Sequence, residues 1–141
     1  MSIGVVIIGH GDLGPALVGS ASLILGEQTN IATVSLNPQD NLESCQCAFK
    51  SGIEKLDISQ GVIVLADLFG GTPCNAAALG LRDRAYPVVA GVNLPMLLEV
   101  LLSRDQVETV DELRRIALET GTKSIVDVSA QLRAGNHPAN P

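Results

Sequence analysis

Short apolar runs, separated by turns and helical patterns, constrain the fold of this chain more than any other feature. The runs occupy residues 3–8, 62–66 and 87–90, and residues 31–36, which include Thr33 and Ser35, form a further short predicted strand. Strands that are apolar along their whole length are typical of parallel sheets buried on both faces. Because parallel neighbours are joined by right-handed crossovers, helices are expected on both faces of the sheet. The sequence therefore predicts an α/β fold with an open, mainly parallel sheet.

Apolar spacing and capping residues predict helices between these strands. Asp40 supplies cap chemistry for a helix that ends near Leu56, and Thr72 is the predicted N-cap of another helix. Asp111 is the predicted cap of a helix that ends at Gly121. The remaining helices are predicted at residues 15–25 and 96–102.

The end of the chain is predicted to hold one more strand and then a tail. Residues 124–128 form the expected last strand, and residues 1–133 form one domain. Residues 134–141 are small, polar and proline-containing, which favours a flexible tail. His137 lies in this tail, where we expect it to be solvated and inert.

Composition and charge exclude two classes of function. The chain has 141 residues, a formal net charge of −6 and a pI near 4.7, whereas nucleic-acid binding requires a basic surface. No apolar run approaches the length of about 20 residues that crosses a bilayer, and no basic segment precedes the first apolar run. We therefore expect a cytoplasmic protein with no nucleic-acid partner and no direct membrane insertion.

The cysteines indicate reduced thiols rather than a disulfide framework. Their number is odd, at positions 45, 47 and 74. Cys45 and Cys47 could form half of a metal site, but no second Cys/His pair follows them, and a structural zinc ion needs four ligands. No metal site is expected.

Polar residues that follow the predicted strands are the candidates for chemistry. His10 follows the first strand between Gly9 and Gly11, and Asp67 follows the third strand. Ligands of open α/β sheets bind at the carboxyl ends of strands. A neutral imidazole is a nucleophile near neutral pH, and a carboxylate on its other nitrogen fixes the tautomer. The alternative is that His10 is an ordinary loop histidine and Asp67 caps a turn.

Two glycine-rich loops favour a bound anion. Gly70-Gly71-Thr72-Pro73 combines flexible backbone with a hydroxyl at the start of a helix, without the lysine of a P-loop. The segment 9–14 matches the G-x-G-x-x-G pattern of dinucleotide-binding folds, but no acidic residue ends the second strand. A tight turn with a helix cap explains the first loop equally well.

Three segments resemble the IIA component of the mannose family of the bacterial sugar phosphotransferase system. They are Val6-Ile7-Ile8-Gly9-His10-Gly11, the run 67–77 that begins Asp67-Leu68-Phe69-Gly70-Gly71-Thr72, and Ala90-Gly91-Val92-Asn93-Leu94-Pro95-Met96-Leu97. Together with Glu119-Thr120-Gly121, the resemblance covers residues 1 to about 128.

The resemblance implies a phosphocarrier that needs no metal or cofactor. His10 would accept a phosphoryl group from the carrier HPr and pass it to a IIB component, which acts with the IIC and IID permease subunits. Asp67 would bond the non-reacting nitrogen of His10, and the phosphoryl oxygens would be bound by Gly11, Gly70, Gly71 and Thr72. The resemblance also implies a homodimer in which the last strand, at 124–128, is exchanged between subunits.

Two alternatives and one departure accompany this interpretation. A regulatory phosphoprotein would use the same histidine without feeding a permease, and a nucleotide-binding module would use the glycine loop without catalysis. Asp12 places a negative charge near the expected phosphoryl site, where the resemblance leads us to expect a neutral side chain.

Overall fold

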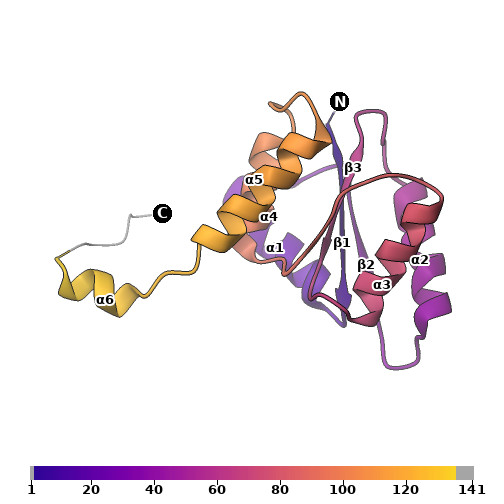
Figure 1. Ribbon diagram of the computed structural model, residues 1–141, viewed down its shortest axis with the longest axis horizontal. Helices are drawn as coiled ribbons and strands as arrows, with labels where there is room; N and C mark the ends of the chain where they lie inside the picture. Colours follow the sequence, from indigo (N-terminus) through magenta and orange to yellow (C-terminus); the bar gives the residue numbers. More distant parts are fainter. Residues whose placement is uncertain (1, 136–141) are drawn as a thin grey trace.

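The computed structural model describes residues 2–135, which form an α/β domain with one projecting segment (Figure 1). In chain order the elements are β1 Gly4–His10, α1 Leu13–Leu25, β2 Ile31–Leu36, α2 Leu42–Glu54, β3 Val62–Ala66, α3 Thr72–Leu79, the short 3-10 helix η1 Gly80–Arg82, β4 Val88–Ala90, α4 Leu94–Ser103, α5 Val110–Lys123 and α6 Val128–Arg133. Among the described residues, no helix is long and apolar enough to span a membrane.

The four strands form one parallel sheet in the order β2-β1-β3-β4. Val6 of the central strand β1 pairs with Ala32 of β2 and Val64 of β3. The chain first extends the sheet on one side of β1 and then crosses to the other side. This reversal creates a topological switch point between the carboxyl ends of β1 and β3, where α/β folds bind ligands. The predicted parallel α/β sheet is confirmed.

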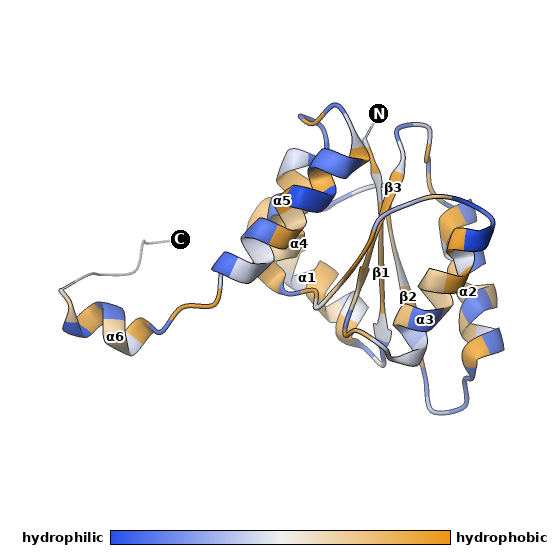
Figure 2. Cartoon of the chain, viewed as in Figure 1, coloured by the Kyte–Doolittle hydropathy of each residue, from blue (hydrophilic) through white to orange (hydrophobic). Residues whose placement is uncertain are grey.

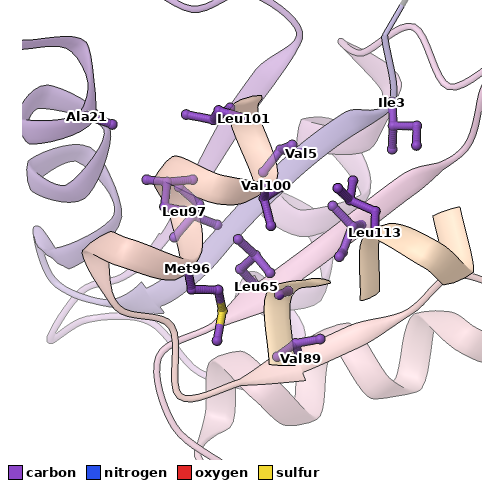
Figure 3. Packing of buried hydrophobic residues seen from close by; sticks show 13 residues of the cluster. Ile3, Val5, Ala21, Leu65, Val89, Met96, Leu97, Val100, Leu101 and Leu113 are labelled. Atoms are coloured by element: carbon purple, nitrogen blue, oxygen red, sulfur yellow. The ribbon is translucent and has the colours of Figure 1, made fainter. Parts of the chain in front are cut away.

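Helices cover both faces of the sheet, as the apolar runs predict. Helices α1, α4 and α5 lie on one face and α2 and α3 on the other (Figure 1). On the first face, Leu97 and Leu113 pack with Leu65 of β3 in a closed apolar cluster (Figure 3). On the second face, Phe49 of α2 and Tyr86 pack with Val64. The strands are mainly apolar, whereas the helices mix polar and apolar residues (Figure 2). These two layers keep β1 and β3 rigid beneath the switch point.

Several helices begin one to two residues from their predicted starts. The N-cap of α2 is Asn41, whose side chain accepts from the Ser44 amide, and Asp40 instead accepts from the amide of Asn37. Thr109 rather than Asp111 caps α5. Because Asp, Asn, Ser and Thr all cap well, neighbouring candidates cannot be ranked from sequence alone.

The start of α3 also differs by one residue. Gly71 is the N-cap, and Thr72 is the first helical residue. The prediction that Thr72 caps this helix is wrong, because the extended backbone of the cap position falls on Gly71 instead.

The predicted last strand at 124–128 is absent from the single chain. Helix α5 continues to Lys123, residues 125–127 have no regular structure, and Val128 begins α6. Ile125 is 83% exposed, and α6 projects away from the sheet (Figure 1). A strand needs a neighbouring strand for its backbone hydrogen bonds, and this segment does not lie against a sheet edge of its own chain. His137 and most of the predicted tail lie outside the described residues.

Candidate functional site

The switch point holds His10 and Asp67, the two residues singled out from the sequence. His10 is the last residue of β1 rather than the first residue after it, and Asp67 follows β3 directly. Strand pairing places Ile8 beside Ala66, and the Asp67 amide donates to the Ile8 carbonyl over 3.1 Å. The sheet register therefore brings the two side chains together across 57 positions of sequence.

One carboxylate oxygen of Asp67 contacts both the ring and the backbone of His10. Nδ1 of His10 lies 2.6 Å from Oδ2 of Asp67, and the His10 amide donates to the same oxygen over 2.9 Å. The other oxygen, Oδ1, accepts from the Leu68 amide over 2.8 Å. These contacts fix the Asp67 carboxylate, and that carboxylate in turn orients the imidazole.

The electrostatics of the pair determine which ring nitrogen is free. Burial by itself raises the pKa of Asp67, but the hydrogen bonds from the His10 side chain and the His10 and Leu68 amides outweigh it, so the pKa is lowered. An ionised carboxylate only accepts, so Nδ1 carries the proton that is shared with Asp67. In the neutral ring the lone pair is then on Nε2. The His10 side chain is 49% exposed and that of Asp67 only 6%, so the imidazole is accessible while its carboxylate partner is covered.

Gly9 has a role that sequence reasoning did not identify. It is buried, and a Cβ atom at this position would lie 3.2 Å from Cβ and 3.3 Å from Oδ2 of Asp67. The absent side chain leaves the space that Asp67 occupies. A glycine inside an otherwise bulky strand is the sequence signal for such a close approach.

The loop from Gly70 to Thr72 lies beside the ring. Gly70 has φ +85°, a conformation that favours glycine, and a Cβ on Gly71 would lie 3.1 Å from Cε1 of His10. The first amides of a helix have no carbonyl partner within the helix, and α3 begins here at Thr72. Gly71 therefore lies against the ring at the start of a helix, where unpaired backbone amides are suited to an anion.

Gly11 occupies the turn after His10 in a different way. Its φ is +56°, and its amide donates to the Leu36 carbonyl over 2.8 Å. That amide is already used, so Gly11 contributes a turn and open space near the ring rather than a free donor.

The dinucleotide alternative finds no support in this geometry. Asp40, the acidic residue nearest the end of β2, accepts from the Asn37 amide over 2.8 Å and from the Ser44 hydroxyl over 3.1 Å. Its carboxylate is therefore engaged in the loop before α2 rather than free for a ribose. Within residues 2–135, no group of three His, Cys, Asp or Glu side chains is arranged to hold a metal ion.

Comparison with known proteins identifies the family. The sequence model of the EIIA-man family, described as "PTS system fructose IIA component", matches residues 4–118. The chain belongs to this family. The predicted resemblance to the mannose-family IIA component of the phosphotransferase system is confirmed, and this membership favours the phosphotransferase interpretation over the dinucleotide one.

Curated relatives of this EIIA-man chain carry different sugar names. The chain is 39% identical over 132 residues to the mannose-specific EIIAB component of Escherichia coli K12, covering 93% of this chain and 41% of the relative. It is 37% identical over 115 residues to the fructose-specific EIIA component of Bacillus subtilis, covering 81% of this chain and 79% of the relative. The chain thus spans less than half of the first relative and most of the second.

Solved structures of related proteins share the fold. The phosphotransferase EIIA component of Streptococcus agalactiae has a TM-score of 0.82 at 30% identity, covering 91% of this chain and 98% of that one. The mannose/sorbose IIA subunit of Enterococcus faecalis has a TM-score of 0.81 at 30% identity and covers both chains fully. The sheet that positions His10 and Asp67 is therefore the family fold.

The lowered pKa of Asp67 predicts how its contribution to stability depends on pH. An acid whose pKa is depressed in the folded state stabilises that state above its unfolded pKa, here near 3.8, and this contribution disappears as pH falls through the folded pKa. Asp67→Asn should lower the free energy of unfolding by about 1–2 kcal/mol near neutral pH. The difference between wild type and variant should shrink as pH falls below about 5 and disappear below the lowered pKa of Asp67. Urea unfolding at several pH values measures it, and a pH-independent difference would contradict the assignment.

Proposed function

We propose that this chain accepts a phosphoryl group from phospho-HPr on Nε2 of His10 and passes it to a IIB component. The observation that supports this most directly is the contact between Nδ1 of His10 and Oδ2 of Asp67, 2.6 Å apart. It leaves an accessible nucleophilic nitrogen on a ring whose orientation and tautomer are fixed. Membership of the EIIA-man family supplies the system in which such a nitrogen would act.

The proposed transfer exchanges one phosphorus–nitrogen bond for another. The lone pair on Nε2 of His10 attacks the phosphorus atom, and the bond to the donor's histidine breaks. The electron pair of that bond returns to the donor's imidazole. The proton on Nδ1 stays hydrogen-bonded to Asp67, whose carboxylate balances the positive charge that the His10 ring acquires. The same steps in the opposite direction deliver the group to the IIB component.

Gly70, Gly71 and Thr72 are the proposed ligands of the phosphoryl oxygens. Their support is the position of this loop against Cε1 of His10 and the unpaired amides expected at the start of α3. The helix dipole adds partial positive charge at the same place. Gly11 would line the site without donating, since its amide bonds to Leu36.

The proposed chain of transfer runs from HPr through this protein to a IIB component and its IIC and IID permease subunits, in the cytoplasm. Relatives named for mannose, fructose and sorbose match this chain at 39, 37 and 34% identity. Because a IIA component touches proteins rather than sugar, we leave the sugar unassigned.

Phosphorylation of His10 is tested by mass measurement. Incubation with phosphoenolpyruvate, enzyme I and HPr should add one acid-labile phosphoryl group to the intact protein. His10→Ala should abolish this gain because it removes the nucleophile, whereas His137→Ala, which changes the only other histidine, should leave it intact. Equal labelling of wild type and His10→Ala would disprove the proposed function.

We also propose a homodimer in which residues 124–128 add a strand to the partner's sheet. β4 is only three residues long, and it is an edge strand of the sheet. The Asn93 side chain, in the loop after β4, donates to the Gly121 carbonyl over 3.1 Å, so the projecting segment leaves the domain near this edge. Its exposed Ile125 and Val126 would become buried, and an exchanged strand protects a sheet edge.

Two truncations test the dimer. Deleting residues 134–141 should leave the dimer intact, because the exchanged segment remains. Deleting everything after Thr122 should expose the sheet edge and cause dissociation or aggregation. Light scattering distinguishes these states, and either a monomeric wild type or a soluble dimer without residues 124–128 would refute the arrangement.

A further inference from the structure

The loops that surround His10 contain acidic residues and no lysine or arginine. These loops and adjoining helix starts comprise residues 10–13, 36–43, 67–72 and 90–94. Their carboxylates are Asp12, Asp40, Glu43 and Asp67. Asp67 is engaged with His10, and Asp40 with Asn37 and Ser44. A phosphoryl group brings two further negative charges to this surface, and no cationic side chain in these loops can balance them.

Asp12 lies in the same loop as His10 and, like Glu43 in the first turn of α2, is not engaged as Asp40 and Asp67 are. It occupies the N-cap position of α1 with φ −91° and ψ 8°, outside the usual cap conformation, and its side chain makes no capping hydrogen bond. It is exposed and follows His10 by two positions. Within the described part of the chain, no hydrogen bond or ion pair is recorded for its carboxylate. The charge is therefore available to a partner.

Large exposed apolar side chains lie in the same loops as Asp12 and Asp67. Phe69, two positions after Asp67, is 88% exposed, and Leu68 and Leu13 are also exposed. Apolar groups with this exposure beside a reactive residue are typical of a protein-docking surface. The loops that surround His10 thus offer exposed apolar side chains, the unengaged carboxylates of Asp12 and Glu43, and no lysine or arginine.

We infer that Asp12 is a specificity-determining residue that selects a phosphodonor protein with a basic side chain beside its phosphohistidine and an apolar patch for Phe69. This inference rests on the proposed function. The donor's cation balances the phosphoryl charge during transfer, which this chain's own loops cannot do. Asp12 attracts that cation during approach. A small anionic donor carries no such cation, so Asp12 only repels it.

Removal of the Asp12 charge should therefore change the transfer rates from the two kinds of donor in opposite directions. Asp12→Asn removes the charge and keeps the size and the capping preference of the side chain. It should slow transfer from phospho-HPr and speed phosphorylation by phosphoramidate. In the second reaction, Nε2 of His10 attacks phosphorus, and ammonia leaves with the electron pair of the broken phosphorus–nitrogen bond. A general loss of activity would slow both reactions.

The experiment compares wild type, Asp12→Asn and Glu108→Gln, all as full chains. Glu108 is exposed before α5, outside the loops that surround His10, so its variant controls for the change in net charge. At about 20 mM salt, Asp12→Asn should lower kcat/KM for phospho-HPr about three- to tenfold, and the difference should nearly vanish at about 500 mM salt. Glu108→Gln should match wild type at both salt concentrations. With phosphoramidate, Asp12→Asn should react faster than wild type.

Three outcomes would contradict the inference. They are an unchanged rate with phospho-HPr at low salt, an equal effect of Glu108→Gln, and slower reaction of Asp12→Asn with both donors. If phosphoramidate labels His10 in wild type but phospho-HPr does not, the proposed function fails and the inference fails with it. If both donors label wild type and Asp12→Asn changes neither rate, only the inference fails.

Discussion

The hydrogen bond between His10 and Asp67 is the interaction on which the site depends. A single oxygen of Asp67 accepts from both the ring and the backbone of His10, so the carboxylate aligns the imidazole relative to the end of its own strand. The orientation of the ring is therefore tied to the carboxyl ends of two paired strands. Sites held by regular elements keep their geometry within narrow limits. Phosphoryl transfer requires such limits, because the attacking nitrogen must be aligned with the phosphorus atom.

The topology of the sheet makes that hydrogen bond possible. His10 and Asp67 are far apart in sequence, and only the direct pairing of β1 with β3 brings them together. The same pairing demands a residue without a side chain at Gly9, against which Asp67 packs. Two closed apolar layers, one on each face, hold the pairing in place. Fold and site are thus consequences of one arrangement of strands.

Sequence reasoning predicted the parts of the structure that depend on local pattern. The strand over residues 31–36 and the strand over 62–66 were predicted at their observed bounds, because each is a short run rich in β-branched and aliphatic residues between turn signals. The strand-end positions of His10 and Asp67 followed from the same pattern. Helix starts were less certain, since Gly71 rather than Thr72 precedes the first turn of α3.

Structural features that depend on contacts between residues far apart in sequence could not be predicted. The segment 124–128 has the composition of a strand, yet the single chain gives it no edge to pair with. The packing of Gly9 against Asp67 also needs the register of two strands, although the glycine itself was visible in the sequence. The engaged amide of Gly11 likewise depends on Leu36, a residue of the neighbouring strand.

The most direct test of the central claim is nitrogen NMR of the phosphorylated protein with ¹⁵N-labelled histidine. The claim is that Asp67 holds Nδ1 and leaves Nε2 as the nucleophile. We expect phosphorus coupling at Nε2 of His10, with Nδ1 still protonated and hydrogen-bonded. Phosphorus coupling at Nδ1 would contradict the account, because the contact with Asp67 would then have to break before transfer.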